Sequence, residues 1–345
     1  MTSRSAALYG CSGPRLTPDE AAFFRAVRPY GFILFARNIE SADQVRALNA
    51  ALRETVDDAS APILVDQEGG RVQRLKPPIA PLYPPGAVYG RLAQKDPWLG
   101  QAFARLGARL IAHDLVGLGF NVDAVPVLDV PQPGAHSVIG DRAYGETPYQ
   151  VARLGRAAAE GLLAGGVLPI IKHIPGHGRA MADSHLELPR VTASRGELAA
   201  VDFPPFAGLS DMPMAMTAHV VFEAYDKEEP ATTSGLVIAE VIRGDLGFDG
   251  LLMSDDLSMK ALKGDFGERV RRSLAAGCDV VLHCNGAKDE MKAVAAATPD
   301  LAGAALTRAK AALARLPHRP EPLDEEAARA QLAAWTAQAL ASPGD

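Results

Sequence analysis

The sequence of 345 residues has few cysteines, no excess of positive charge and no long apolar run. Its cysteines, Cys11, Cys278 and Cys284, are odd in number and lack metal-ligand spacing, which suits a reducing compartment. The net charge of −6 provides no basic surface for nucleic acid. No stretch reaches membrane-spanning length, and the first residues contain no apolar segment typical of a signal peptide. We therefore expect a soluble, cytoplasmic protein that binds neither nucleic acid nor membrane.

Hydrophobic residues make up 48% of the chain, so a large core can form, and the chain contains short apolar runs typical of buried strands. The runs are Ala6–Tyr9, Gly31–Phe35, Pro62–Val65, Val122–Leu128, Val167–Ile171, Pro213–Met216, Gly250–Met253 and Asp279–Leu282. Between them lie helical segments with start signals, such as Thr17 with Glu20 and Ser41 with Gln44.

Strand–helix alternation repeated about eight times, in a chain above ~250 residues, predicts an α/β fold of the (β/α)8 TIM-like barrel type. A doubly wound open sheet is the alternative, but no Gly-rich phosphate-binding turn follows Tyr9 or Phe35. We expect a catalytic barrel over residues 1–316. A helical extension, residues 317–345, follows a Pro-flanked linker and is expected to pack on the barrel.

Polar side chains stand just past nearly every apolar run. They are Arg37, Asn38, Asp66, Gln67, Glu68, Asp129, Lys172, His173, His219, Asp255, Asp256 and Asn285. In a parallel barrel all strands end on one face, so residues far apart in sequence converge there. This pattern predicts a single polar site at the carboxyl ends of the strands.

Asp255 emerges from a buried run, next to Asp256. A carboxylate fixed there can act as a nucleophile, a general base or a metal ligand, or it can simply cap a helix. We expect Asp255 to face the pocket and Asp256 to cap a turn. His185, with Asp183 as its orienting carboxylate, is the candidate general acid and base, because an imidazole titrates near ~6.5. A loop-stabilising hydrogen bond between these two residues is the alternative.

Charged groups near the same strand ends suggest a polar substrate such as a sugar. Asp66 can accept hydrogen bonds from adjacent hydroxyl groups, while cationic side chains donate to others. The candidate binding residues are Asp66, Arg74, Arg142, Lys172 and His173. The structural alternative is that these groups pair with Asp129 and Glu68 in the barrel mouth.

Together the motifs resemble those of the single-domain β-N-acetylglucosaminidases of glycoside hydrolase family 3, over about Gly31 to Asn285. The motifs are Asp66-Gln-Glu-Gly-Gly-Arg-Val-Gln-Arg74, Gly140-Asp-Arg-Ala-Tyr144, Lys172-His-Ile-Pro-Gly-His-Gly178, Asp183-Ser-His185 and Gly247-Phe-Asp-Gly-Leu-Leu-Met-Ser-Asp-Asp-Leu-Ser-Met259. One departure is Ile174, where the family usually has Phe.

The resemblance implies a retaining exo-β-N-acetylglucosaminidase that releases N-acetylglucosamine from anhydro-muropeptides in peptidoglycan recycling. It implies that Asp255 is the nucleophile and that Asp183 and His185 form the acid/base dyad. It also implies that the candidate binding residues named above hold the sugar. The expected substrate is N-acetylglucosaminyl-anhydro-N-acetylmuramic acid, with or without peptide, and neither a metal nor an organic cofactor is implied.

Three other functions remain open from the sequence. A phosphorylase is one, because a histidine acid/base does not repel phosphate. A metal-dependent amidohydrolase is another, although no His-X-His follows the first run. A non-enzymatic sugar-binding protein is the third, but it should have lost the nucleophile or the dyad. We expect a monomer, because no apolar interface stripe is evident.

Overall fold

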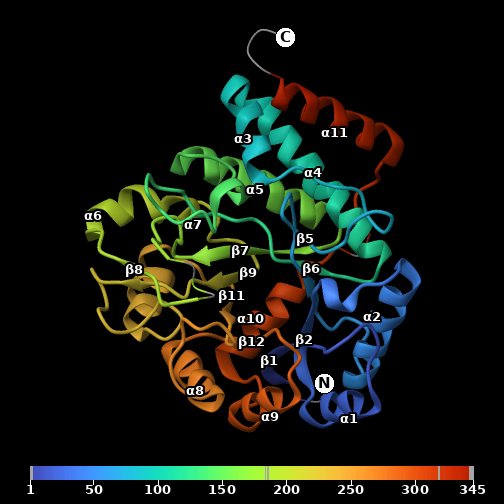
Figure 1. The fold of residues 1–345 in the computed structure, drawn as a ribbon, viewed down its shortest axis with the longest axis vertical. Coiled ribbons are helices and arrows are strands. Elements are labelled where there is room, and N and C mark those ends of the chain that lie inside the picture. Colours follow the sequence, from blue (N-terminus) through green and yellow to red (C-terminus); the bar gives the residue numbers. More distant parts are fainter. Residues whose placement is uncertain (1–2, 183, 185, 318, 342–345) are drawn as a thin grey trace.

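The computed structural model describes residues 3–182, 184, 186–317 and 319–341. Within them, parallel strands close into one barrel surrounded by helices (Figure 1). The strands are β1 (Ser5–Gly10), β2 (Pro29–Leu34), β3 (Ile63–Val65), β6 (Val122–Asp123), β7 (Leu168–Ile174), β9 (Met214–Thr217), β11 (Leu251–Asp256) and β12 (Val280–His283). Going round the barrel, the order is β1, β12, β11, β9, β7, β6, β3 and β2. The predicted (β/α)8 barrel is confirmed.

Alternation along each strand divides the apolar side chains between two packing layers. Side chains of a strand point alternately to its two faces. Leu8, Ile33 and Leu64 therefore pack with one another inside the barrel. Their neighbours Phe32 and Ile63 pack outward against the surrounding helices. Both faces of every strand are thus covered, which explains why the runs are almost purely apolar.

Helices cover the outside of the barrel. The α-helices are α1 (Pro18–Val27), α2 (Ala42–Val56), α3 (Gly86–Lys95), α4 (Pro97–Gly117), α5 (Pro148–Ala164), α6 (Arg195–Glu197), α7 (Pro204–Ala207), α8 (Phe266–Ala276), α9 (Lys288–Ala297), α10 (Gly303–Leu313) and α11 (Glu325–Leu340). Two π-helices, η3 (Leu198–Asp202) and η4 (Val237–Asp245), lie between β7 and β9 and between β9 and β11 in the sequence. Reciprocal capping boxes start α1 at Thr17 and Glu20, and α2 at Ser41 and Gln44, as predicted.

The structure corrects two strand boundaries. The run predicted as a strand through Leu128 ends as β6 at Asp123, because Pro126 has no N–H to donate to a neighbouring strand. β7 continues to Ile174, so Lys172 and His173 lie within the strand and not in the loop that follows it. The chain after β6 nevertheless stays beside β7, since Leu128 N donates to Lys172 O at 2.7 Å.

Two small sheets at the loops were not predicted. β4 (Gln67–Gly69) and β5 (Val72–Gln73) form an antiparallel hairpin directly after β3. β8 (Arg190–Val191) and β10 (Val221–Phe222) form a short parallel pair. Runs of two or three residues are too short for a period of two to be recognised in sequence.

The last described helix, α11, lies against α3 and α4 at the top of the view in Figure 1. Arg329 on α11 donates to Asp114 at 2.5 Å, and the Tyr83 hydroxyl donates to the same carboxylate at 2.6 Å. Trp335 packs edge-on against Phe103 of α4. The division into a barrel (1–316) and an extension (317–345) stays a prediction.

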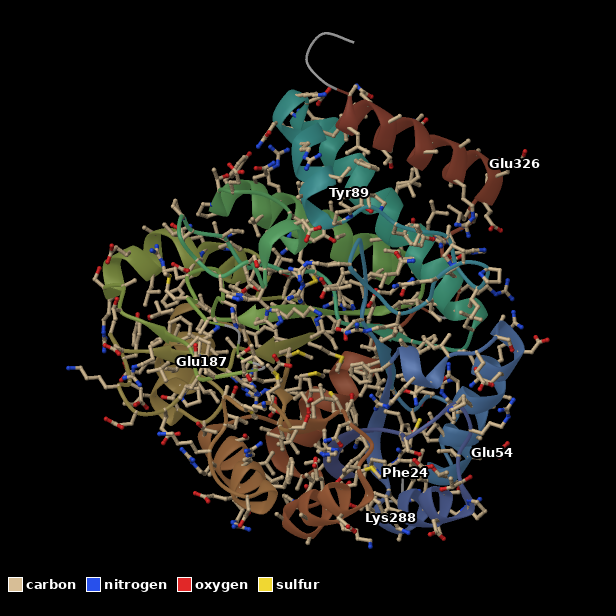
Figure 2. All side chains as sticks on the ribbon, in the orientation of Figure 1. Phe24, Glu54, Tyr89, Glu187, Lys288 and Glu326 are labelled. Atoms are coloured by element: carbon tan, nitrogen blue, oxygen red, sulfur yellow. The ribbon has the colours of Figure 1, made fainter. Side chains whose placement is uncertain are left out.

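Side chains follow the expected distribution of burial. Phe24 and Tyr89 are enclosed between helices and barrel, whereas Glu54, Lys288 and Glu326 lie at the periphery (Figure 2). None of the helices described here is both long and apolar enough to cross a membrane.

Candidate active site

The alternation inside the barrel also selects which polar side chains face the mouth. Asp66 stands two residues after the inward Leu64, and Lys172 two residues after the inward Ile170. A spacing of two keeps a side chain on the same face of a strand, so both groups lie above the apolar interior of the barrel. Asp255 lies at the end of β11, past a register irregularity between Met253 and Asp256, and its place at the site follows instead from its electrostatic effect on the buried His177 and His219.

Asp66 is held between two cations. Its Oδ1 accepts from Lys172 Nζ at 3.0 Å and its Oδ2 from Arg74 Nη2 at 2.9 Å. Burial alone would raise the pKa of Asp66, but Lys172 and Arg74 together lower it below its ordinary value. Asp66 is thus a carboxylate of fixed orientation that stays ionised at neutral pH.

Glu68 joins Lys172 to Arg142. The guanidinium of Arg142 donates twice to Glu68, at 2.8 Å each, and Lys172 Nζ lies 2.6 Å from Glu68 Oε1. The Lys172 side chain is only 2% exposed. Burial would lower the pKa of Lys172, yet the carboxylates of Asp66 and Glu68 raise it. The predicted Asp66, Arg74, Arg142 and Lys172 thus form one charged network through Glu68.

His173 is oriented by a buried carboxylate. Its Nδ1 lies 2.7 Å from Asp129 Oδ2, and Asp129 Oδ1 accepts from the backbone N–H of His177 at 2.7 Å. Burial opposes ionisation of Asp129, but His173 and His177 lower its pKa. Gly178 allows this loop to approach closely, since a Cβ there would fall 2.0 Å from Val130 O. The structural alternative, pairing with Asp129, is therefore realised for His173.

Asp256 caps the turn after β11, as expected, since it accepts from Ser258 N at 3.0 Å and from Cys284 N at 3.1 Å. Asp255 Oδ1 accepts from Asp256 N at 2.8 Å, and the catalytic role of Asp255 stays a prediction. Beside it, the buried His219 places Nε2 3.0 Å from the carbonyl oxygen of Asp256. Because that carbonyl only accepts, Nε2 carries the proton of His219.

Two histidines near Asp255 are neutral at pH 7. Burial, followed by the charge of His173, lowers the pKa of His177 to about 4, although Asp255 acts in the opposite direction. Burial likewise lowers the pKa of His219, and Asp255 partly offsets this. The carboxylate of Asp255 is thus surrounded by polar but uncharged rings.

The buried thiol of Cys284 is influenced both by the aspartates at the end of β11 and by Asp66 of the charged network. Burial raises the pKa of Cys284, and the carboxylates of Asp256, Asp255 and Asp66 raise it further. Since both Asp255 and Asp66 act electrostatically on this thiol, the candidate nucleophile and the charged network lie in the same region of the barrel mouth.

Asp183 and His185, the candidate acid/base dyad, lie outside the described residues. Between them, Ser184 is described. Its Oγ lies 3.3 Å from His177 Nε2, and its carbonyl oxygen accepts from Ala261 N at 3.3 Å. Ser184 therefore joins the loop after β7 to the connection between β11 and α8.

Sequence reasoning named Glu68 and Asp129 only as alternative ion-pair partners, and it gave no catalytic or binding role to His177 or His219. All four follow apolar runs closely, but only tertiary contacts distinguish a residue that positions another from one that binds. Asp123 was missed entirely because it lies inside a run. Burial raises its pKa to about 8, Gln67 N donates to its Oδ1 at 2.9 Å, and its Oδ2 has no partner among the described residues.

Comparison with known proteins identifies the family of this chain. A model of the glycosyl hydrolase family 3 N terminal domain matches residues 25–316. A β-hexosaminidase of Alkalilimnicola ehrlichii is 41% identical over 282 residues, or 81% of this chain and 80% of that protein. One from Neisseria gonorrhoeae is 39% identical over 279 residues, or 79% of this chain and 75% of that protein.

Solved structures give the same result. NagZ from Neisseria gonorrhoeae in complex with N-trifluoroacetyl-D-glucosamine has a TM-score of 0.84 and 33% identity, covering 98% of this chain and 97% of that one. A glycoside hydrolase family 3 β-N-acetylglucosaminidase from Paenibacillus has a TM-score of 0.84 and 30% identity, covering 99% and 69%. The barrel and its mouth are those of a glycoside hydrolase. The chain belongs to glycoside hydrolase family 3, which confirms the resemblance inferred from its motifs.

Proposed function

We propose that this enzyme is a retaining exo-β-N-acetylglucosaminidase that removes terminal N-acetylglucosamine from anhydro-muropeptides during peptidoglycan recycling in the cytoplasm. The observation that carries the proposal is the carboxylate of Asp255 at the end of β11, which acts on the buried rings of His177 and His219, together with the network of oriented, charged groups at the barrel mouth. The names of its relatives, β-hexosaminidase and β-N-acetylglucosaminidase, agree with this substrate class.

Sugar binding is assigned to Asp66, Arg74, Arg142, Lys172 and His173. The ionised Asp66 retains lone pairs for sugar hydroxyl groups, while Arg74 and Lys172 hold its orientation. Arg142 acts mainly through Glu68, to which it is bound in bidentate fashion. His173, with Nδ1 on Asp129, keeps Nε2 available for a substrate hydroxyl group.

Catalysis proceeds in two displacements. The Asp255 carboxylate attacks the anomeric carbon, and the electron pair of the glycosidic bond leaves with the aglycone oxygen. His185, oriented by Asp183, donates a proton to that oxygen. It then takes a proton from water, which attacks the glycosyl–Asp255 ester and releases the sugar with its configuration retained. The contacts of Ser184 with His177 and Ala261 support a dyad close to the end of β11.

The first experiment is turnover of a chromogenic aryl β-N-acetylglucosaminide in phosphate-free buffer that contains a chelator. Rapid release of the aryl group supports a glycosidase that needs neither phosphate nor a removable metal. Activity that appears only with added phosphate, with a sugar phosphate as product, would identify a phosphorylase. Absence of turnover under both conditions would contradict the proposed sugar specificity.

The natural substrate requires a separate assay. N-acetylglucosaminyl-anhydro-N-acetylmuramic acid, with and without its stem peptide, should be cleaved to free N-acetylglucosamine, and nuclear magnetic resonance of the first product should show the β anomer. A first product with the α configuration would contradict the retaining mechanism.

A further inference from the structure

We propose that Arg37 forms an anion-binding subsite at the barrel mouth, which takes a carboxylate carried by the leaving group of the substrate. For the substrate proposed above, that carboxylate is the lactyl ether acid of the muramic residue. The inference rests on the proposed function, since it concerns the part of the same substrate that leaves. It adds a recognition element outside the sugar-binding residues.

The position of Arg37 is defined by the ends of three strands. The residue follows β2 in the short turn Ala36–Asn38. Its Nε donates to Cys11 O, just past β1, at 3.1 Å, and its Nη2 donates to Cys284 O, just past β12. The guanidinium therefore lies across the carboxyl ends of β1, β2 and β12, on the face that carries the site.

A glycine provides the room for this arrangement. A Cβ at Gly10 would fall 2.1 Å from Cys284 O and 2.9 Å from Arg37 Nη2. Any larger residue would therefore displace either the strand end or the guanidinium. The end of β1 is thus shaped to admit Arg37.

Arg37 is linked to both halves of the active site. The N–H of Cys284, whose carbonyl receives Arg37, donates to Asp256 beside Asp255. On the other side, the Phe35 ring lies 4.9 Å from the guanidinium carbon of Arg37 and 5.4 Å from that of Arg74, which binds Asp66. Arg37 is consequently connected both to the turn that follows Asp255 and to the sugar-binding network.

The charge of Arg37 is not neutralised in the way that its neighbours' charges are. Arg74, Arg142 and Lys172 each contact a carboxylate and are at least partly buried. The recorded partners of Arg37 are neutral carbonyl oxygens, and no ion pair is found for it among the described residues. Its side chain is exposed at the rim. An exposed guanidinium fork with no acidic partner is suited to a carboxylate ligand.

The depth at which each group lies in the site indicates which part of the substrate carries the carboxylate that Arg37 binds. Lys172 and Glu68 are buried, so the sugar that contacts their network sits deep in the mouth. N-acetylglucosamine carries no charge that would need a further cation. The exposed rim faces the leaving group instead, and a muramic residue brings one carboxylate there.

The test compares two disaccharides that differ in one charge: N-acetylglucosaminyl-anhydro-N-acetylmuramic acid and its methyl ester. Arg37→Gln should lower kcat/KM for the acid by about 10-fold or more, as loss of a charge-assisted hydrogen bond does. It should change kcat/KM for the ester and for the aryl glycoside by less than about twofold. Arg37→Lys keeps the charge and should fall between the two.

Arg15→Gln is the matched control. Arg15 also lies in the segment after β1, but it is exposed and already paired with Glu40 at 3.2 Å. The kcat/KM of this variant should therefore equal that of wild type on both disaccharides. Equal loss on acid and ester in Arg37→Gln would overturn the proposal, because it would indicate a structural role at the strand ends.

The wild-type enzyme provides a second test that does not depend on the folding of a variant. The ester should be the poorer wild-type substrate, with KM raised about 10-fold, and added salt should weaken binding of the acid only. Equal wild-type kcat/KM for acid and ester would overturn the anion subsite while leaving the proposed glycosidase intact. Failure of wild type to cleave the aryl glycoside would instead contradict the proposed function itself.

Discussion

At the scale of single residues, the adjacent aspartates Asp255 and Asp256 have different roles. Asp256 accepts from Ser258 N and Cys284 N and so ties down the turn after β11, whereas Asp255, one position earlier, is the proposed nucleophile. The register of β11 shifts between Met253 and Asp256, so a strict period of two does not by itself assign these two side chains.

The pair supplies a direct comparison. Asp255→Asn should reduce kcat on the aryl glycoside on the order of 10⁴-fold or more, since no nucleophile remains, with little change in melting temperature. Asp256→Ala should mainly lower stability, by ~1–3 kcal/mol, because Ser258 and Cys284 lose their acceptor. Thermal unfolding and steady-state kinetics on both variants check this. The reverse pattern would exchange the two assignments.

The general acid is tested through the leaving group. His185→Ala should slow hydrolysis of substrates with poor leaving groups much more than hydrolysis of activated aryl glycosides, because only the former need a proton. We expect a difference of about 10²-fold or more between the two substrate classes. Uniform loss across a series of aryl leaving groups would show that His185 is not the acid.

At the scale of elements, Lys172 links β7 by ion pairs to the segment that runs from β3 into β4 at the barrel mouth. Its ammonium lies 3.0 Å from Asp66 and 2.6 Å from Glu68, and it is nearly inaccessible to solvent. The hairpin of β4 and β5 owes its position to this contact and to Arg142, so the sugar-binding network also stabilises the fold.

Replacing this cation should therefore reduce stability. Lys172→Met should lower the free energy of unfolding by roughly 1.5–3 kcal/mol at pH 7, because Asp66 and Glu68 each lose one of their two cationic partners and keep Arg74 and Arg142. In the wild type the pKa values of Asp66 and Glu68 are depressed, so their stabilising contribution exists above pH ~4 and is lost as pH falls further. The deficit of the variant should consequently shrink in acid. Denaturant titrations at pH 7 and pH 2 measure it, and a constant deficit would contradict the ion-pair explanation.

The sequence predicted elements better than it predicted contacts. Apolar runs and the caps at Thr17 and Ser41 are local signals, so the barrel strands and the starts of α1 and α2 could be found. The bidentate pairing of Arg142 with Glu68 joins residues 74 positions apart, and no local pattern encodes it. The polar strand ends indicated where the site lies. Which residues bind and which only position others required the fold.

At the scale of the whole molecule, α11 is connected through side-chain and backbone contacts to the β4–β5 hairpin of the candidate site. Arg329 binds Asp114 and the Tyr83 hydroxyl, and the backbone of Tyr83 receives the N–H of Gly70 at the tip of the hairpin. The helix is thus joined to the hairpin that presents Glu68 by a short series of contacts. We assign it a structural role.

A substitution on α11 tests that role. Arg329→Met should lower the free energy of unfolding by ~1–3 kcal/mol, because Asp114 is left without its cation. It should leave kcat/KM on the aryl glycoside within about twofold. Glu326→Gln, on the exposed face of the same helix, is the control and should change stability by less than about 0.5 kcal/mol. A large catalytic defect in Arg329→Met would show that the helix acts on the site.

The buried thiols have one more consequence. Cys11 follows β1 and Cys284 follows β12, so these two lie at the ends of the first and last strands of the barrel, which pair with each other. Cys278 packs elsewhere, with its Sγ donating to Thr232 O at 3.6 Å. Each is buried, and burial raises the pKa of each. A thiol reagent can therefore modify Cys11 and Cys284 only when the structure opens around these two strand ends. The rate at which these thiols are labelled in native buffer therefore measures how often the barrel opens at this place. If bound sugar slows the labelling, the same measurement reports ligand binding without an engineered probe.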